Sequence, residues 1–363
     1  MPFHNLFSAR AIRAGMASFF RRSGQDNPRL PSMPEEIEIE TTTTCNINPP
    51  CVMCCRHLAT MAPVAFIPQE MIEKLKPLFP RIKSVSLHGI GEPLMQEALF
   101  SLMDRFSPQA HISFTSNGIL LDKKKILQMI KHRLNRLSVS LDAANPLTYK
   151  KIRRDDYFCA IKNNLKLLFE IKKELGVDYP ELWINMTIMN ENLAEVVDFV
   201  RLAQEVEANA VEFHVLGQMP VQYCVKSDSF NFDYAAQMID TSSSLFIENM
   251  RAAKVMADQL SIRFSSMIDE ILKAIQPNPG RGCERQKQRK KYYCTRPWRH
   301  ALIHLNGDVW VCCHMRGENC VMGNLNGSDF NTIWNNDKIT SIRKDIAKGI
   351  MPSACSHCPV FEK

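Results

Sequence analysis

Residues 36–54 read EIEIETTTTCNINPPCVMC, an alternation of acidic and apolar residues that leads into three cysteines. The alternation predicts a β-strand with one apolar face, followed by a loop that carries Cys45, Cys51 and Cys54. Three thiolates on one loop can bind three irons of a four-iron, four-sulfur (4Fe-4S) cluster and leave the fourth iron open to another ligand. The first strand of the fold is therefore predicted to lead into a metal site.

A second group of cysteines lies near the other end of the chain. Cys294 is followed by Gly307 and Cys312, and the pair Cys355 and Cys358 completes the group. Four thiolates can bind every iron of a cluster and leave none open. The same ligand spacing also fits a structural zinc ion, so zinc is the alternative at both groups.

Cysteine content and composition indicate a cytoplasmic globular protein. The chain has 363 residues, of which 45% are hydrophobic and 13 are cysteines. Arginines interrupt each apolar stretch of the first 25 residues, which argues against a secretory signal; without one, grouped cysteines are typical of metal ligands rather than disulfides. Because no run of about 18 apolar residues occurs, we expect no transmembrane segment.

The net charge of +7 is concentrated in residues 281–299. Eight basic residues lie there against the single acidic residue Glu284. A solvated linker is the simplest interpretation, and the functional alternatives are a clamp for an anionic substrate or a docking surface for an acidic electron donor. Aromatic residues are not interleaved with these charges, since Tyr292, Tyr293 and Trp298 lie at one end, and this argues against nucleic acid as a partner.

Strand-like runs alternate with helical patterns through the middle of the chain. Apolar residues fall on one helix face from Met71 to Phe79 and from Leu193 to Ala203, and Asp122 and Asn192 stand where helix caps are expected. Strands are predicted near residues 36–43, 83–88, 111–115, 136–141, 182–189 and 210–216. Six strand and helix units predict an α/β fold, a partial (βα)6 TIM-like barrel.

The predicted barrel is one of four parts of the chain. These parts are a basic amphipathic segment at 1–35, the partial barrel at 36–275, a basic linker at 276–292 and a small C-terminal iron-sulfur module at 293–363. Pro277, Pro279 and Gly280 mark the linker. A module as small as the last part is expected to depend on its metal for a stable core.

Polar residues and glycines follow several of the predicted strands. They are the run Gly89-Ile-Gly91-Glu92-Pro93 after the second strand, Ser116 after the third, Ser140 at the end of the fourth and Asn190 after the fifth. Taken singly, such residues are what any turn prefers. Because the carboxyl ends of parallel strands share one rim, we expect these residues to gather beside the first cysteine loop.

The cysteine loop together with the run from Gly89 to Pro93 resembles the radical S-adenosylmethionine (SAM) superfamily over most of residues 36–216. The family spacing is C-x3-C-x2-C, whereas this chain has two further residues between Cys45 and Cys51. The resemblance implies a 4Fe-4S cluster bound by Cys45, Cys51 and Cys54, with Cys55 as the alternative to Cys54. It also implies that SAM binds the open iron and is cleaved reductively to methionine and a 5′-deoxyadenosyl radical.

The resemblance further implies a set of SAM contacts. Gly89, Gly91 and Glu92 match the stretch that binds the methionine amino group, where a carboxylate can accept a charge-assisted hydrogen bond. Ser140 and Arg153 match the stretch that contacts the ribose and the carboxylate, with Arg154 as the alternative to Arg153. Position alone assigns Ser116 and Asn190 as cofactor contacts, with loop capping as the alternative.

The C-terminal module resembles the twitch form of the family's SPASM extension. Cys294, Cys312, Cys355 and Cys358 are in the order of that form, and Gly323-Asn-Leu with Ile333-Trp fills the gap as in many members. The resemblance implies one auxiliary 4Fe-4S cluster, which is closed to substrate but can still pass electrons. A flavodoxin or ferredoxin-type protein is the implied electron donor.

These features predict an enzyme that abstracts hydrogen from its substrate, which is a small molecule or a peptide. The resemblance implies dehydrogenation or epimerisation, since members with one auxiliary cluster often act in this way on sugars and cyclitols. A small carbohydrate-like metabolite is favoured over a peptide, because about 35 residues before the first strand are too few for a domain that binds a leader peptide. Modification of a peptide or protein is the alternative. For epimerisation, Cys320 or Cys313 is a candidate hydrogen donor. A non-catalytic iron-sulfur or zinc protein is the alternative from another class.

Overall fold

The structure is a computed structural model that describes residues 33–54, 56, 66–217, 232–266, 294–313, 315, 320–356 and 358. The chain divides into two compact units. Unit 1 comprises Met1–Glu38, Gln69–Lys83 and Cys283–Lys363, and unit 2 comprises Ile39–Pro68 and Ser84–Gly282. The predicted linker 276–292 and most of the predicted segment 1–35 lie outside the described residues.

Unit 2 is built on a parallel sheet. Its strands, in spatial order, are β2 (Ser84–His88), β3 (His111–Ser116), β4 (Arg136–Ser140), β5 (Glu181–Ile188), β6 (Ala210–Val215) and β7 (Arg263–Ser266). Strand β1 (Glu36–Glu40) ends next to β2: the amide of Thr41, the residue after β1, donates to the His88 carbonyl oxygen at 2.9 Å. Since each of the six predicted strands is present and the sheet is parallel, the predicted fold class is confirmed.

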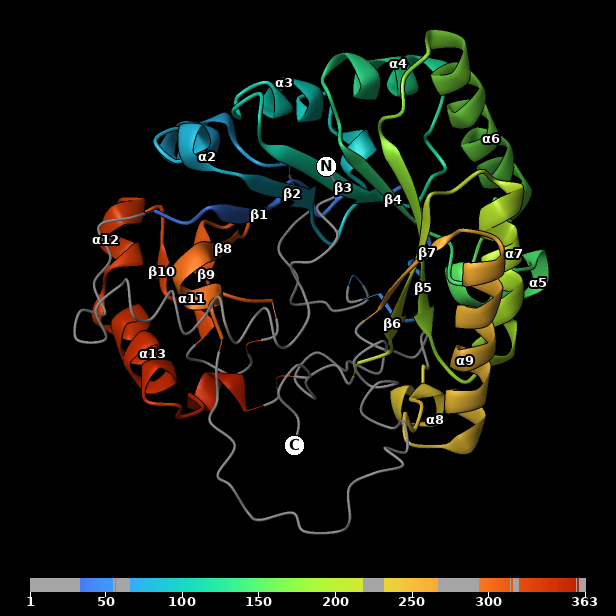
Figure 1. Ribbon diagram of the computed structural model, residues 1–363. Coiled ribbons are helices and arrows are strands. Elements are labelled where there is room, and N and C mark those ends of the chain that lie inside the picture. The colour runs from blue at the N-terminus through green and yellow to red at the C-terminus, as the bar shows by residue number, and fades with distance from the viewer. Residues whose placement is uncertain are drawn as a thin grey trace. The chain divides into compact units, whose positions relative to one another are not determined.

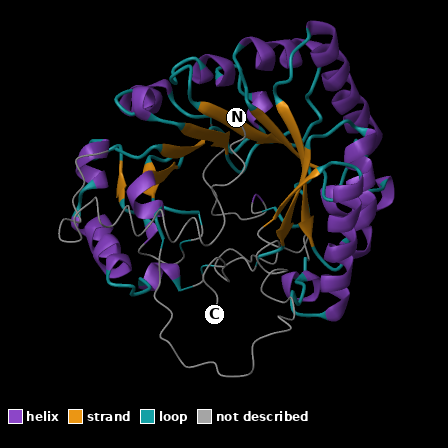
Figure 2. Cartoon of the chain, viewed as in Figure 1, coloured by secondary structure: helices purple, strands orange, loops and turns teal. Residues whose placement is uncertain are grey.

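Helices connect the strands of unit 2. They are α3 (Leu99–Met103), α4 (Lys123–Lys131), α5 (Pro146–Arg153), α6 (Phe158–Leu175), α7 (Val196–Glu205), α8 (Tyr234–Gln237) and α9 (Ser244–Gln259), with the 3-10 turns η3 (Pro93–Met95) and η4 (Leu193–Glu195). Figure 1 shows α4, α6, α7 and α9 along the outer side of the curved sheet, and Figure 2 shows the same layer of helices in purple. The strand β7 was not predicted, because four residues reading RFSS are too short and too polar to stand out.

The two faces of this sheet differ in chemistry because side chains alternate along each strand. The face toward the helices is apolar: Val139, Ile184 and Phe213 are fully buried, and the rings of Phe213 and Phe199 on α7 lie 5.7 Å apart. The opposite face carries polar side chains, among them Ser140, Asn185, Glu212 and His214. The apolar face supplies the core, and the polar face is left for contacts with solvent or ligand.

The two expected helix caps have different outcomes. Asp122 caps α4 as predicted, since its carboxylate accepts a hydrogen bond from the Lys125 amide at 2.7 Å. Asn192 stands at the cap position of η4 but makes no capping bond there. Its amide nitrogen instead donates to the carbonyl oxygens of Asp142 and Thr187, at 2.8 and 2.9 Å. This asparagine therefore precedes η4, as predicted, but its side chain joins β5 to the segment after β4.

Unit 1 holds the C-terminal module. Its strands follow the order β10 (Gly323–Asn324), β9 (Asp308–Trp310), β8 (His300–Ile303) and β1, and its helical elements are α2 (Gln69–Leu75), η2 (Phe79–Arg81), α11 (Arg296–Arg299), α12 (Phe330–Trp334), α13 (Asp337–Ala347) and η7 (Ser353–Cys355). Strands β8, β9 and β10 are antiparallel. Gly307 lies in the turn between β8 and β9 with a φ of 87°, a conformation that favours glycine.

The helices in the described part of the chain include none with the length and hydrophobicity that a bilayer crossing requires.

The burial pattern of α6 predicts how much the protein is destabilised when a buried side chain of this helix is truncated. Leu165 is fully buried, whereas Leu175, at the end of the same helix, is 48% exposed. Leu165→Ala should lower the free energy of unfolding by about 2–5 kcal/mol, because it leaves a cavity against the sheet. Leu175→Ala is the matched control and should change it by less than about 1 kcal/mol. Urea unfolding followed by far-UV circular dichroism measures both, and equal effects would contradict this packing.

Candidate active site

The cysteine loop is held on unit 2 by backbone contacts. The Val52 amide donates to the Ile152 carbonyl oxygen of α5, and the Tyr234 hydroxyl of α8 donates to the Met53 carbonyl oxygen, both at 2.9 Å. Val52 and Met53 also pack on a small core that includes Ile152. The Cys54 amide closes a turn onto the Cys51 carbonyl oxygen. Two of the three cysteines are thus fixed in a turn against α5, while Cys55, the alternative ligand, lies outside the described residues.

Glu92 is the most deeply embedded charged group of this region, with 1% of its surface exposed. One carboxylate oxygen accepts hydrogen bonds from the Leu94 amide at 3.0 Å and the Ser116 hydroxyl at 2.9 Å. The other accepts from the Asn117 amide at 2.6 Å. Burial raises the pKa of Glu92, and these hydrogen bonds oppose that shift because they favour the carboxylate. The side chain therefore ties the loop after β2 to the loop after β3.

The glycines before Glu92 are required by a close backbone approach. A Cβ on Gly91 would lie 2.3 Å from the Thr44 carbonyl oxygen, and one on Gly89 would lie 2.9 Å from the Thr42 carbonyl oxygen. The Gly91 amide donates to the Thr42 oxygen and the Glu92 amide to the Thr44 oxygen, at 3.0 and 2.7 Å. These contacts bring the predicted Gly89 to Glu92 run alongside the residues that precede Cys45.

Asn117 connects the carboxylate to the first cysteine. Its side-chain amide donates to the Cys45 sulfur at 3.7 Å and to the Asn46 side-chain oxygen at 2.8 Å, while its backbone amide donates to Glu92. Ser116 was selected from the sequence and the neighbouring Asn117 was not, because an asparagine before a glycine is ordinary turn chemistry. Its position next to the chosen Ser116 was the available signal.

Arg153 contacts the second cysteine of the loop, Cys51. Its guanidinium donates to the Cys51 sulfur at 3.5 Å and forms an ion pair with Asp142 at 2.5 Å, with 8% of its surface exposed. Asp142, which was also not selected, accepts a hydrogen bond from the Thr187 amide at 2.7 Å. The alternative residue Arg154 ends α5 in a left-handed conformation. Arg153 thus connects the cysteine loop to the ends of β4 and β5.

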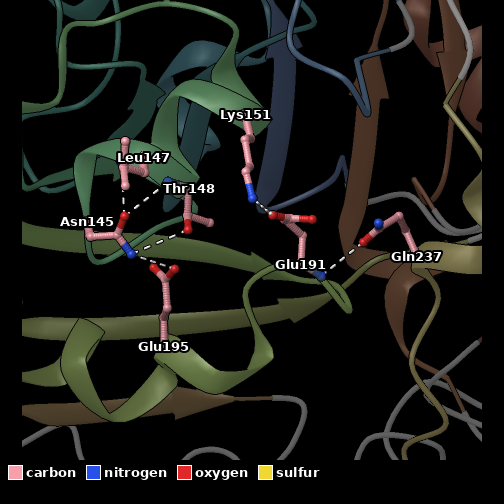
Figure 3. A network of polar contacts seen from close by, with 7 residues as sticks. All are labelled: Asn145, Leu147, Thr148, Lys151, Glu191, Glu195 and Gln237. Carbon is pink, nitrogen blue, oxygen red and sulfur yellow. Dashed lines mark hydrogen bonds and ion pairs between the residues drawn. The ribbon is translucent and has the colours of Figure 1, made fainter.

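A polar network positions the helix that carries Arg153 (Figure 3). Asn145 caps α5 by accepting from the Leu147 and Thr148 amides, and its amide nitrogen donates to Glu195 at 2.7 Å. At the next turn of α5, Lys151 pairs with Glu191 at 2.7 Å, and the Glu191 backbone amide donates to the Gln237 side chain. The helix is therefore tied to the segment after β5, and that segment is tied to α8.

Asn190 belongs to the same segment. Its side-chain nitrogen donates to the carbonyl oxygens of Ala236 and Met238, at 2.7 and 3.3 Å. These bonds join the loop after β5 to α8, and the cofactor contact of Asn190 stays a prediction. Ser140 ends β4 on the polar face, in register with Asn185. The structure therefore brings Glu92, Ser116 and Arg153 into one contact network with the cysteines, and leaves Ser140 and Asn190 beside it.

The three thiols of the loop fit an iron-sulfur cluster. Burial raises the pKa of Cys45 and of Cys51, the negative charge of Cys54 adds to both shifts, and Arg153 opposes the shift at Cys51. Cys54 is thus close enough to Cys45 and to Cys51 for its charge to affect both. Within the described ranges, no three His, Cys, Asp or Glu side chains converge closely enough for a single metal ion. A 4Fe-4S cluster binds each thiolate at a different iron, so three neighbouring thiols can hold three of its irons.

The cysteines of unit 1 also lie close together. Burial raises the pKa of Cys294 to about 12, and the nearby charges of Cys312 and Cys355 add to that rise. The Cys358 amide donates to the Cys355 carbonyl oxygen at 3.0 Å. Cys313 hydrogen-bonds the sulfur of Cys312, which raises its own pKa. Cys320 is 1% exposed, and its proposed role as a hydrogen donor stays a prediction.

The approach at Gly91 gives a direct test of the site. Gly91→Ala should disrupt the loop that holds Cys45, because its Cβ meets a backbone oxygen that cannot turn aside. Iron bound after anaerobic reconstitution should then fall by about half, as one of two four-iron clusters is lost. Gly327→Ala is the control, since the nearest atom to its Cβ is 4.0 Å away. Full iron content in Gly91→Ala would show that this approach does not support the site.

Family comparisons agree with this arrangement. The sequence profile of the radical SAM superfamily matches residues 39–203, and that of the SPASM iron-sulfur cluster-binding domain matches residues 294–359. The chain is 26% identical over 241 residues to a probable GTP 3′,8-cyclase of Methanocaldococcus jannaschii, covering 64% of this chain and 76% of the relative. It is 30% identical over 186 residues to a probable GTP 3′,8-cyclase of Methanothermobacter thermautotrophicus, covering 50% of this chain and 57% of the relative.

Solved structures share the fold at low sequence identity. Streptococcus suis SuiB bound to S-adenosylmethionine has a TM-score of 0.59 at 16% identity, over 93% of this chain and 74% of SuiB. The protein anSMEcpe with bound AdoMet and a Cp18Cys peptide has a TM-score of 0.60 at 17% identity, over 90% of this chain and 86% of that protein. At this identity the likeness concerns the fold alone.

Two matched family domains and the geometry around the first cysteine loop lead to one assignment. The chain belongs to the radical SAM superfamily, with a C-terminal SPASM domain, and its cofactors are SAM, a SAM-binding 4Fe-4S cluster and an auxiliary cluster.

Proposed function

We propose that this radical SAM enzyme acts on a small carbohydrate-like metabolite, which it dehydrogenates or epimerises. The observation that carries this proposal is the polar face of the unit 2 sheet, where Ser140, Asn185 and Glu212 lie in register on β4, β5 and β6. Hydroxyl, amide and carboxylate groups on a single face offer donors and acceptors to a ligand rich in hydroxyl groups.

Within this proposal the residues of unit 2 prepare the cofactor site. Cys45, Cys51 and Cys54 would hold three irons, and Glu92 would accept a hydrogen bond from the ammonium group of SAM. The bound cofactor supplies a radical strong enough to remove hydrogen from an unactivated carbon. Asn117 and Arg153 donate toward the sulfurs of Cys45 and Cys51. Such hydrogen bonds spread the charge of a thiolate and raise the reduction potential of its cluster.

The remaining assignments follow the same pattern. Gly89 and Gly91 would present backbone groups to SAM, Ser116 would hold Glu92 in place, and Ser140 and Asn190 would border the cofactor. In unit 1, Cys294, Cys312, Cys355 and Cys358 would bind the auxiliary cluster. An auxiliary cluster closed by four thiolates suits electron transfer rather than substrate binding. A flavodoxin or ferredoxin-type protein would supply the reducing electron.

A nucleoside triphosphate is the second candidate substrate. It is supported by the relatives named GTP 3′,8-cyclase, although the matched region spans 57–76% of their length. A triphosphate on the polar face would meet the carboxylate of Glu212, which carries the same sign of charge as the phosphates and has His214 beside it. The peptide alternative stays open for the test, because the likeness to SuiB and anSMEcpe shows the fold alone.

The function is tested by measuring 5′-deoxyadenosine from anaerobically reconstituted, reduced enzyme with SAM and one added compound. Cyclitols, hexoses and amino sugars should raise its rate of formation, and GTP and short peptides should not. Cys51→Ala is the control that should abolish formation in every sample, because one iron loses its ligand. Stimulation by GTP or by a peptide alone would replace the proposed substrate class. If the product carbon gains no deuterium in heavy water, Cys320 as hydrogen donor is excluded.

The role of Glu92 is tested by equilibrium binding of SAM. Glu92→Gln should weaken SAM binding by about 10-fold or more, since the charge that attracts the ammonium group is lost. The exposed Glu97 provides the matched control Glu97→Gln, for which affinity should stay unchanged. Thermal unfolding of both variants separates lost binding from lost folding. Equal affinities in folded Glu92→Gln and the parent protein would remove Glu92 from the cofactor site.

A further inference from the structure

The polar face of the unit 2 sheet contains a straight row of hydrogen-bonding groups. Ser140 on β4 is paired with Asn185 on β5, Asn185 with Glu212 on β6, and Glu212 with Ser265 on β7. Paired residues of parallel strands project to the same side, and neighbouring strands lie about 4.8 Å apart. The row therefore spans four strands with a polar group at each one.

The side chains of Glu212 and His214 are neighbours on one face of β6. The His214 ring nitrogen Nε2 lies 3.7 Å from a carboxylate oxygen of Glu212, and their side chains are 45% and 23% exposed. Burial lowers the pKa of His214, but Glu212 and then Asp142 raise it, and the net shift is upward. Burial raises the pKa of Glu212, whereas His214 lowers it, and the net shift is downward. Both shifts favour the ionised pair, which offers a donor and an acceptor side by side.

Asn185 gives a second, independent indication of a ligand. Its side chain is 7% exposed, and its oxygen Oδ1 has no hydrogen-bond partner among the residues that the structure describes. A buried amide oxygen without a partner costs free energy, so it is usually satisfied by water or a ligand. The residue lies between Ser140 and Glu212 in the row, on the face away from the helices. It takes no part in the contacts that join Glu92, Cys45 and Cys51.

The charges along this face favour a neutral ligand over an anionic one. Glu212 and His214 compensate each other, and Arg136 is the other cation that affects both of their pKa values. Arg136 lies at the start of β4, over the ring of Trp183. At the amino end of β5, Glu181 forms an ion pair with Arg263 at 2.7 Å. Arg263 is thus paired with Glu181, and Glu212 is the charged residue within the row.

We propose that Glu212 and His214, together with Asn185, bind adjacent hydroxyl or amino groups of a cyclic polyol and orient its ring. This inference rests on the proposed function and deepens it, because it assigns the groups that recognise the substrate. Glu212 accepts hydrogen bonds from the substrate, the imidazolium of His214 donates one, and the Asn185 oxygen accepts another. Recognition by three groups in a fixed row selects for the relative orientation of neighbouring substituents.

The test measures how 5′-deoxyadenosine formation depends on the concentration of three probes: myo-inositol, glucose and glucosamine. For the probe that stimulates the parent enzyme, Glu212→Gln and His214→Gln should each raise the half-saturating concentration by about 10-fold or more, as expected for loss of one charge-assisted hydrogen bond. Glu181→Gln is the matched control on β5 and should leave that concentration unchanged. SAM affinity and iron content, measured in parallel, report whether each variant retains its cofactor site.

The outcomes separate this inference from the proposed function. A raised half-saturating concentration in both β6 variants with unchanged SAM affinity supports the inference. Unchanged half-saturating concentrations in both variants overturn it and leave the proposed function standing. Equal effects in Glu181→Gln also overturn it, because the response would then be a general one of the sheet. If none of the three probes stimulates the parent enzyme, the proposed substrate class fails, and this inference fails with it.

Discussion

The buried carboxylate of Glu92 is the contact on which the proposed cofactor site depends. A charged group with 1% exposure is stable only when its oxygens are satisfied, and here they accept three hydrogen bonds from the loops after β2 and β3. Through Asn117 the same carboxylate reaches Cys45. Removing the charge would therefore disturb the loops after β2 and β3 and, through Asn117, the proposed iron ligand Cys45.

The rest of unit 2 follows from a sheet with two different faces. The apolar face packs against helices and fixes the strands, so the polar face does not need to contribute to the core. The ends of the strands then hold the cysteine loop, Glu92 and Arg153, and the polar row lies along β4 to β7. Asn185, Glu212 and His214, the residues proposed to bind the substrate, take no part in the contacts that join Glu92, Cys45 and Cys51.

The sequence was informative where local pattern and chemistry coincide. The six predicted strands, the cap at Asp122 and the run from Gly89 to Glu92 could be identified because periodicity and turn residues are local signals. Asn117 and Arg153 meet their cysteines from 72 and 102 positions away, and no local pattern reports such a contact. Arg153 was selected because of a family resemblance, whereas Asn117, Asp142 and the pair Glu212 and His214 looked like ordinary turn or strand residues. The strand β7 was missed because four residues, of which only Phe264 is apolar, give no clear alternation.

The most direct test of the central claim is electron paramagnetic resonance of a protein that retains only the first cysteine group. In a variant with Cys294, Cys312, Cys355 and Cys358 replaced by alanine, the anaerobically reduced protein should show the signal of one 4Fe-4S cluster, and SAM should change that signal by binding the open iron. A reduced cluster whose signal is indifferent to SAM, or zinc in place of iron, would contradict the account.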